Sequence, residues 1–207
     1  MTENSSAPPP PRPLRYVALG DSYTIGTSVE EAERWPNQLV AVESRLELIA
    51  NLGVNGCASH DLIAAQLPEL DRLQPEFVTL LVGVNDIVER VPRGIYRANI
   101  ARILDDLIAR VGHRRVLAIT TPDYTVTPSG GLYGNTARQS EAIRAINAIL
   151  ASVAGRRLVR VVDVYDLSLK AADDPSLVAH DGLHPSPEQY VLWVARIFLA
   201  VRALLAG

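Results

Sequence analysis

The chain has 207 residues, 48% of them hydrophobic and 21% charged, with a formal net charge of -3. This length predicts one domain with a sizeable core. The longest apolar runs fall far short of the roughly 20 residues that span a bilayer, which excludes a membrane-spanning protein and stable membrane insertion. The basic residues are dispersed rather than clustered, so the sequence predicts no nucleic-acid partner. One cysteine, Cys57, excludes an internal disulfide framework.

The first thirteen residues differ in composition from the rest of the chain. They contain four consecutive prolines, and they lack the apolar run of a secretory signal. We therefore expect residues 1–13 to be a disordered, Pro-rich tail before a single domain at residues 14–207. A Pro-rich recognition segment flanked by Arg12 is the alternative. Without an export signal, the expected location is cytoplasmic.

Short apolar runs and longer helical patterns alternate along the domain. The runs are rich in Val, Ile and Leu and nearly continuous in apolar character, as buried parallel strands are. The predicted strands are Leu14–Leu19, Leu46–Asn51, Phe77–Val82, Arg115–Thr120 and Leu158–Val164.

Helical spacing of apolar residues predicts the intervening helices. Apolar residues recur at i, i+3, i+4 and i+7 from Ile100 to Val111 and again from Ile143 to Val153. A last helix is predicted at about Glu188–Leu205, and others near Trp35 and near Ser59. The alternation predicts an α/β fold in which helices cover both faces of a five-stranded parallel sheet.

In such a sheet, ligands bind beyond the carboxyl ends of the strands. Four segments lie at these ends or in the turn before the last helix, and they carry polar residues and glycines. They are Gly20-Asp21-Ser22-Tyr23, the segment from Asn51 to Gly56, Gly83-Val84-Asn85-Asp86, and Asp181-Gly182-Leu183-His184.

Three of these residues could form a nucleophilic site. Ser22 follows the first strand by two residues, and a serine needs an adjacent base to attack a carbonyl. His184 could be that base. Asp181 precedes it by three residues, so in a turn its carboxylate could bond to the imidazole and stabilise the imidazolium.

Three hydrogen-bond donors could surround a developing oxyanion. Gly56 follows the second strand, and its N–H can approach a ligand closely. Asn85 follows the third strand and offers a side-chain amide. The Ser22 N–H would be the third donor. Taken singly, Ser22 or Asn85 could instead cap a helix, and Gly56 could be a loop glycine.

Together the four segments resemble the sequence blocks of the SGNH hydrolases, the GDSL esterase and lipase superfamily. The first block reads Gly-Asp-Ser-Tyr, without the leucine of the family name. The resemblance implies a three-layer α/β/α sandwich with a flavodoxin-like arrangement. It also implies a catalytic triad of Ser22, Asp181 and His184, and an oxyanion hole formed by the Ser22 N–H, the Gly56 N–H and Asn85.

The reaction implied by the resemblance is hydrolysis of a carboxylic ester through an acyl-enzyme, without a metal or other cofactor. The expected partner is a small-molecule ester with a short acyl chain. We expect its binding residues to be Tyr23, Val54, Ile87, Tyr124 and Leu183. The segment Thr121–Thr136, rich in Gly and Pro, is expected to be a mobile flap, or else a plain connecting loop.

Other interpretations of single motifs are weaker. His180 and His184 have the spacing of a zinc-binding H-E-x-x-H helix, but Gly182 and Pro185 disfavour a helix there. Cys57 and His60 could form a nucleophile pair, although a small buried thiol is the more ordinary interpretation.

Three activities could use the same triad: thioesterase, carbohydrate deacetylase and acyltransferase. A non-catalytic, flavodoxin-like module that holds a phosphate near Ser22 is the alternative of another class. Neither the substrate's alcohol part nor the oligomeric state can be inferred from the sequence.

Overall fold

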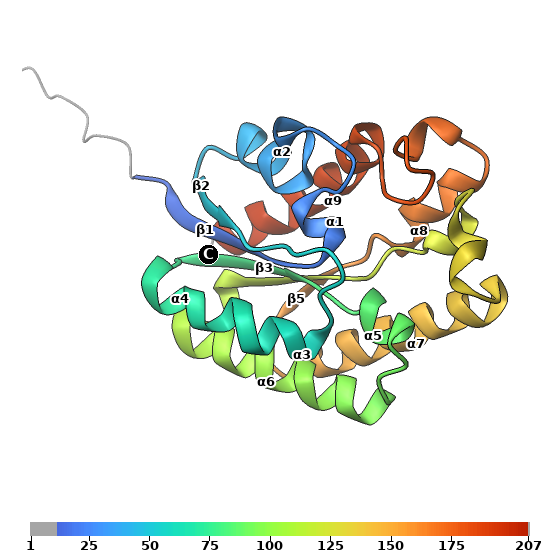
Figure 1. The fold of residues 1–207 in the computed structure, drawn as a ribbon. Helices are drawn as coiled ribbons and strands as arrows, with labels where there is room; N and C mark the ends of the chain where they lie inside the picture. The colour runs from blue at the N-terminus through green and yellow to red at the C-terminus, as the bar shows by residue number, and fades with distance from the viewer. Residues whose placement is uncertain (1–11, 207) are drawn as a thin grey trace, which may run out of the picture.

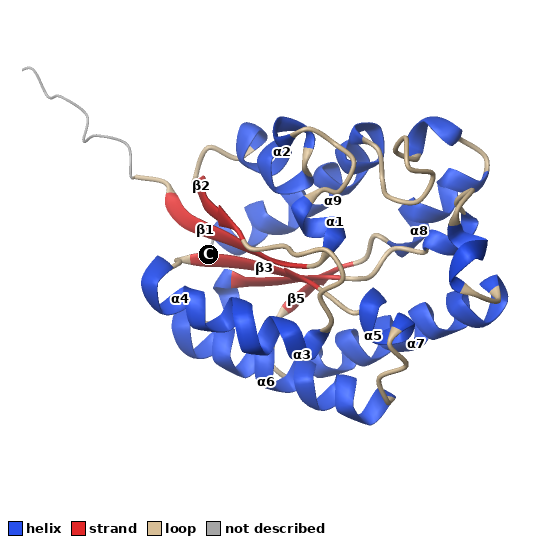
Figure 2. Cartoon of the chain, in the orientation of Figure 1, coloured by secondary structure: helices blue, strands red, loops and turns tan. Residues whose placement is uncertain are grey.

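A five-stranded parallel sheet forms the centre of the protein in the computed structural model, which describes residues 12–206 (Figure 1, Figure 2). In spatial order the strands are β2 (Leu46–Asn51), β1 (Leu14–Gly20), β3 (Phe77–Leu81), β4 (Val116–Ile119) and β5 (Arg160–Val162). All neighbouring strands are parallel, which confirms the predicted fold class.

Helices cover both faces of the sheet, so the molecule has the three expected layers (Figure 1). One face packs against α4 (Leu67–Leu73), α6 (Arg93–Val111) and α7 (Thr136–Gly155), and α3 (Ser59–Asp61) lies against α6. The other packs against α2 (Trp35–Val42), α8 (Tyr165–Ser168) and α9 (Pro187–Leu205). Two short helices, α1 (Ser22–Ile25) and α5 (Val84–Val88), begin shortly after strands β1 and β3.

Alternating side chains on each strand supply the two cores. On β1, Val17 and Leu19 belong to the core under α4, α6 and α7, whereas Tyr16 and Ala18 belong to the core under α2 and α9. All four are fully buried. Strands that are apolar on both faces are characteristic of parallel sheets between two helical layers, which explains their continuous apolar sequences.

Three strands are shorter than predicted: β3 ends at Leu81 instead of Val82, and β4 and β5 are shortened for local backbone reasons. The predicted strand Leu158–Val164 is paired only at Arg160–Val162, because Leu158 has φ +57° and closes the turn after α7. The predicted strand Arg115–Thr120 begins at Val116, because a 3-10 turn includes Arg115. The helix predicted from Glu188 begins at Pro187, where the Ser186 hydroxyl caps it by accepting a bond from the Gln189 N–H.

The predicted N-terminal tail is described only at its last two residues, since residues 1–11 lie outside the described part. The Arg12 guanidinium donates two hydrogen bonds to the Glu76 carboxylate, at 2.6 and 2.8 Å. Arg12 therefore contacts the start of β3, while the expected tail conformation remains a prediction.

The order of the strands creates a topological switch point between β1 and β3. From β1 the chain passes outward to β2, and from β3 it passes the opposite way to β4 and β5. Connections therefore diverge at the carboxyl ends of β1 and β3 and leave a crevice there. Ser22 follows β1 and Asn85 follows β3, so both lie at this crevice.

Candidate active site

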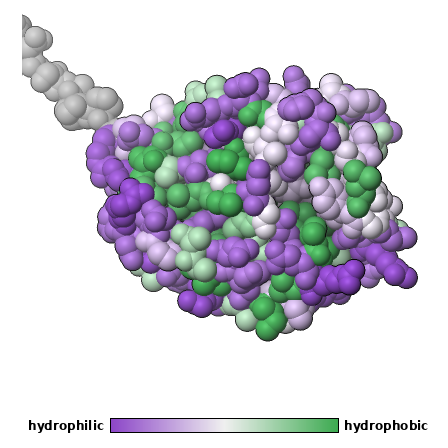
Figure 3. All heavy atoms as spheres, viewed as in Figure 1, coloured by the Kyte–Doolittle hydropathy of each residue, from purple (hydrophilic) through white to green (hydrophobic). Residues whose placement is uncertain are grey.

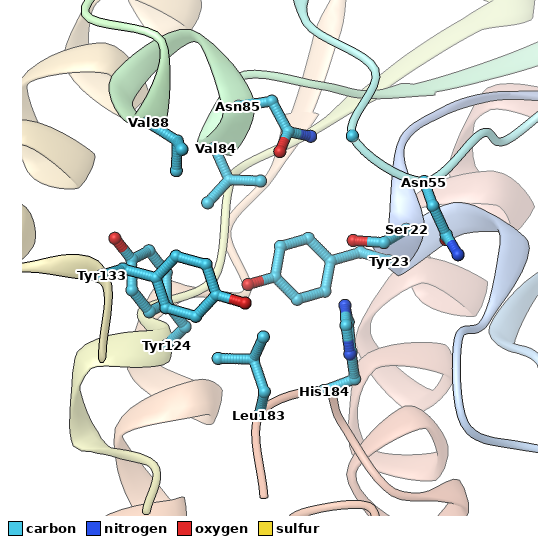
Figure 4. Close-up of a pocket in the computed structure, with 11 residues that line it drawn as sticks. Ser22, Tyr23, Asn55, Val84, Asn85, Val88, Tyr124, Tyr133, Leu183 and His184 are labelled. Carbon is cyan, nitrogen blue, oxygen red and sulfur yellow. The ribbon is translucent and has the colours of Figure 1, made fainter. Parts of the chain in front are cut away.

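Ser22 is the first residue of α1, and local backbone geometry fixes it there. Asp21 is the N-cap, and its side-chain Oδ1 accepts a hydrogen bond from the Tyr23 N–H at 3.0 Å. The helix ends after a single turn at Gly26, whose φ of +72° is a left-handed conformation that favours glycine. This sharp strand-to-helix turn directs the Ser22 side chain into the crevice (Figure 4).

Asp181 and His184 form a compact turn immediately before α9. The His184 Nδ1 lies 2.6 Å from Asp181 Oδ2. The other oxygen, Oδ1, accepts hydrogen bonds from the backbone N–H groups of Leu183 and His184, at 2.8 and 2.9 Å. The carboxylate therefore fixes both the backbone of the turn and the orientation of the imidazole.

The surroundings of Asp181 keep its carboxyl group ionised. Burial alone raises the pKa of Asp181, but hydrogen bonds from His184, from Ser28 and from the backbone outweigh it. The net result is a pKa well below the ordinary value. A carboxylate that stays ionised at neutral pH can stabilise an imidazolium.

The imidazole of His184 lies between this carboxylate and Ser22. In Figure 4 its second nitrogen is directed toward the Ser22 side chain. Among residues 12–206 no hydrogen bond joins the Ser22 hydroxyl to that nitrogen, and such bonds are often loose before substrate binds. The Tyr23 ring meets the His184 ring edge-to-face, with centroids 5.8 Å apart, and limits its movement.

The three expected oxyanion donors border the same crevice. The N–H groups of Ser22 and Gly56 bond to no acceptor within the described part of the chain. Gly56 has φ +78°, a conformation that favours glycine. The Asn85 amide donates to the Cys57 carbonyl at 3.0 Å, which fixes it and leaves its second N–H available.

A buried glutamine connects two of these segments. Gln66 accepts a hydrogen bond from the Gly20 N–H at 3.0 Å and donates to the Gly20 carbonyl at 2.7 Å. Its amide also lies 3.3 Å from the Cys57 sulfur. Gln66 belongs to a π-helical turn, Leu62–Gln66, between α3 and α4. It therefore holds the end of β1 against the segment that carries Gly56.

These residues surround a pocket of about 300 Å³. Its lining is Ser22, Tyr23, Asn55, Gly56, Val84, Asn85, Val88, Tyr124, Tyr133, Leu183 and His184. Figure 4 shows Val84, Val88, Tyr124 and Tyr133 on one side, with Ser22, Asn55 and His184 on the other. The pocket thus has an apolar half beside a polar half.

Of the five expected substrate-binding residues, Tyr23, Tyr124 and Leu183 line the pocket. Val54 and Ile87 lie outside this lining. Val54 is 53% exposed, and Ile87 packs between the two cores.

Four lining residues were not among the expected binding residues: Asn55, Val84, Val88 and Tyr133. Val84 and Val88 are four residues apart, which puts them on the same face of α5. This spacing was available in the sequence, but a helix as short as α5 gives no periodic signal.

The alternative motifs do not form functional clusters. His180 is exposed, and the segment from His180 to His184 is a turn rather than a zinc-binding helix. The Cys57 thiol is buried, and burial raises its pKa to about 12. The His60 ring lies beside Asp61 and Glu89, at 3.4 and 3.8 Å, so it faces carboxylates.

The segment expected as a flap contacts both the pocket and the Asp–His turn. It contains two 3-10 turns, Tyr124–Val126 and Gly130–Tyr133. The Ser129 N–H donates to the Gly182 carbonyl at 2.8 Å, and the Tyr124 and Tyr133 rings meet edge-to-face at 5.6 Å. Mobility of this segment remains a prediction.

Asp21 makes the stability of the protein dependent on pH. Its side chain is fully buried, Oδ2 has no hydrogen-bond partner among residues 12–206, and burial raises its pKa to about 8. Between about pH 4 and 8 the folded state then holds a proton that the unfolded state has lost. Stability from this group is therefore full at low pH and is lost as pH rises toward 8, by up to about 1.4 kcal/mol per pH unit.

We expect Asp21→Asn to remove this contribution, because the amide oxygen can still cap α1 but cannot titrate. Urea unfolding at pH 5, 6.5 and 8 measures the difference in free energy of unfolding between Asp21→Asn and wild type. That difference should shift in favour of the variant as pH rises. A difference that stays constant with pH would contradict a raised pKa for Asp21.

The chain belongs to the GDSL-like Lipase/Acylhydrolase family, whose model matches residues 18–192. The match confirms the resemblance to the GDSL superfamily and makes the protein a hydrolase of ester substrates. It spans all four sequence blocks, strands β2 to β5 and the end of β1. No curated protein sequence matches the chain.

Solved structures share the fold at low sequence identity. The lipase/acylhydrolase of Enterococcus faecalis superposes with a TM-score of 0.72 at 21% identity, over 92% of this chain and 96% of that one. Esterase EstA from Pseudoalteromonas sp., solved as inhibited by monoethylphosphonate, gives 0.70 at 16%, over 93% and 99%. Axe2, an acetylxylan esterase from Geobacillus stearothermophilus, gives 0.68 at 17%, over 91% and 94%.

The described surface and helices give two further facts. On the face drawn in Figure 3, hydrophobic residues show in small groups among hydrophilic ones. Within residues 12–206, none of the helices combines the length and apolar character needed to cross a membrane.

Proposed function

We propose that this protein is a serine esterase that cleaves short-chain carboxylic esters through an acyl-enzyme, with Ser22, His184 and Asp181 as its triad. The observation that carries the proposal is the 2.6 Å contact between His184 Nδ1 and an Asp181 carboxylate kept ionised by its hydrogen bonds. That contact leaves the other imidazole nitrogen as a base directed toward Ser22 (Figure 4).

The first half of the reaction forms the acyl-enzyme. Ser22 Oγ attacks the ester carbonyl carbon while His184 takes the hydroxyl proton, and the carbonyl oxygen becomes an oxyanion. As the intermediate collapses, the bond to the alkoxy oxygen breaks and His184 returns the proton to the leaving alcohol. Water then repeats these steps in place of Ser22 and releases the carboxylic acid.

The oxyanion in both halves is stabilised by the N–H groups of Ser22 and Gly56 and by the Asn85 amide. We expect Asn85→Ala to lower kcat by about 10²–10³-fold with little change in KM, because this donor acts mainly on the charge that develops in the transition state. Steady-state kinetics on p-nitrophenyl acetate measures the change.

Asn99→Ala is the matched control for Asn85→Ala. The Asn99 amide donates to the Ser59 hydroxyl at 2.9 Å and does not line the pocket. Asn99→Ala removes a hydrogen bond comparable to that of Asn85 but no group that lines the pocket. Its kcat should therefore stay within a few-fold of wild type. An equal loss of kcat in both variants would indicate general destabilisation instead of an oxyanion donor.

The pocket supports a short acyl group. Its volume of about 300 Å³ is at the small end for ligand sites. The apolar half, with Val84, Val88 and Tyr133, suits a hydrocarbon chain. On the polar side, Asn55 lines the pocket and its amide oxygen accepts a hydrogen bond from the Thr27 hydroxyl.

Labelling with a fluorophosphonate probe, followed by peptide mapping, tests the nucleophile. Stoichiometric modification of Ser22 that disappears in His184→Ala would support an activated serine. Absence of labelling in folded protein would favour the non-catalytic module.

A substrate panel then separates the activities that could share the triad. Rates on p-nitrophenyl acetate, butyrate and octanoate are expected to favour the two shorter esters. Faster turnover of acyl-CoA or acetylated sugars would identify a thioesterase or a deacetylase instead. Transfer of the acyl group to an added alcohol in preference to water would identify an acyltransferase.

A further inference from the structure

A residue outside the four sequence blocks contacts the carboxylate of the proposed triad. The Ser28 hydroxyl donates a hydrogen bond to Asp181 Oδ2 at 2.7 Å, across 153 positions of sequence. This is the same oxygen that faces His184 Nδ1 at 2.6 Å. With the two backbone donors on Oδ1, the carboxylate has four hydrogen-bonding contacts, two to each oxygen.

The backbone at Ser28 is strained in the conformation that makes this contact. Its φ is +68°, in the left-handed region that residues with a Cβ rarely adopt. Glycine would be the favoured residue at such a position, yet the chain has a serine there. Strain of this kind persists when surrounding contacts over-determine it, and it is often associated with functional sites.

The neighbouring residue suggests why the chain takes this path. After α1 ends at Gly26, the Thr27 hydroxyl donates to Asn55 Oδ1, beside Gly56 on the oxyanion side. Ser28 then reaches Asp181 on the other side. One short segment that follows the nucleophile's helix thus contacts both halves of the site.

We propose that Ser28 is a positioning residue of the reaction, acting through Asp181 to hold the His184 imidazole in the productive orientation toward Ser22. The inference rests on the proposed triad. A hydroxyl donor on Oδ2 restricts rotation of the carboxylate and keeps that oxygen in line with Nδ1. The Ser28 hydroxyl also interacts with the negative charge on Oδ2, which would otherwise interact with His184 Nδ1 alone.

Two substitutions separate the hydroxyl from the backbone strain. Ser28→Ala removes the hydroxyl and keeps a Cβ at φ +68°, whereas Ser28→Gly removes the hydroxyl and relieves the strain. If the hydroxyl acts through Asp181, both variants should lower kcat on p-nitrophenyl acetate by about tenfold, with KM unchanged. Ser28→Gly should nevertheless be the more stable of the two in thermal unfolding.

Three further measurements test whether Ser28 acts by orienting the His184 imidazole. The downfield proton resonance of His184 Nδ1–H, assigned by its loss in His184→Ala, should move in both variants. Ser28→Thr keeps a hydroxyl and should recover most of kcat, even though its branched Cβ strains the backbone further. Ser129→Ala is the matched control, because its hydroxyl contacts the Asp181 backbone carbonyl at 3.2 Å and not the carboxylate.

The outcomes that overturn the inference are distinct from failure of the triad itself. If Ser28→Gly keeps wild-type kcat and an unmoved resonance, Ser28 serves the backbone only. If Ser129→Ala lowers kcat as much as Ser28→Ala, loosening of the turn explains both losses. If Ser22→Ala retains full activity, the proposed function fails regardless of Ser28.

Discussion

Ser22→Ala is expected to lower kcat on p-nitrophenyl acetate by at least about 10³-fold while the protein stays folded. Alanine keeps the first position of α1 and the Ser22 N–H, so the cap from Asp21 and one oxyanion donor remain. Only the atom that forms the acyl bond is lost. What activity remains should reflect substrate binding and the oxyanion donors without covalent catalysis.

The control for this change is Ser44→Ala. Ser44 is exposed and precedes β2, so it lies toward the amino edge of the sheet, opposite the crevice. Its kcat should equal that of wild type, and circular dichroism should show the same fold for both variants. A folded Ser22→Ala protein with full activity would show that Ser22 is not the nucleophile.

Much of the fold follows from the sequence because the strands are buried on both faces. Residues such as Val78 and Leu80 face one helical layer, while Phe77 and Leu81 face the other, so the strands are nearly continuous apolar runs. The long helices have periodic stripes for the same reason. By contrast, α1 and α5 each contain five or fewer residues, and caps and turns rather than periodicity determine them.

The site could be predicted only where its residues occur in recognisable short blocks. Gly20-Asp21-Ser22 and Asp181-Gly182-Leu183-His184 are local in sequence, so their chemistry can be inferred before any contact is known. Ser28 gives no comparable signal, because its partner lies 153 positions away and its strained φ depends on the path after α1. The same limitation applies to Tyr133, which comes to the pocket through the fold of a long loop.

Asp181→Asn is expected to reduce kcat by about 10²–10⁴-fold, because it would change the tautomer of His184. The asparagine oxygen can replace Oδ1 and still accept from the N–H groups of Leu183 and His184. Its amide nitrogen would then occupy the place of Oδ2 and present a donor to Nδ1. The imidazole would have to accept there and carry its proton on the other nitrogen, which could no longer take the proton of Ser22.

The matched control is Asp173→Asn, which should leave kcat unchanged because Asp173 is exposed and does not line the pocket.

Because the hydrogen bonds of Asp181 lower its pKa, the wild-type carboxylate stays ionised down to acidic pH. Loss of wild-type activity between pH 5 and 7 would therefore not reflect protonation of Asp181. In an Asp181→Asn background, Ser28→Ala should have little further effect on kcat, since its hydroxyl acts on a carboxylate that is no longer present. An undiminished effect of Ser28→Ala there would mean that Ser28 and Asp181 act independently.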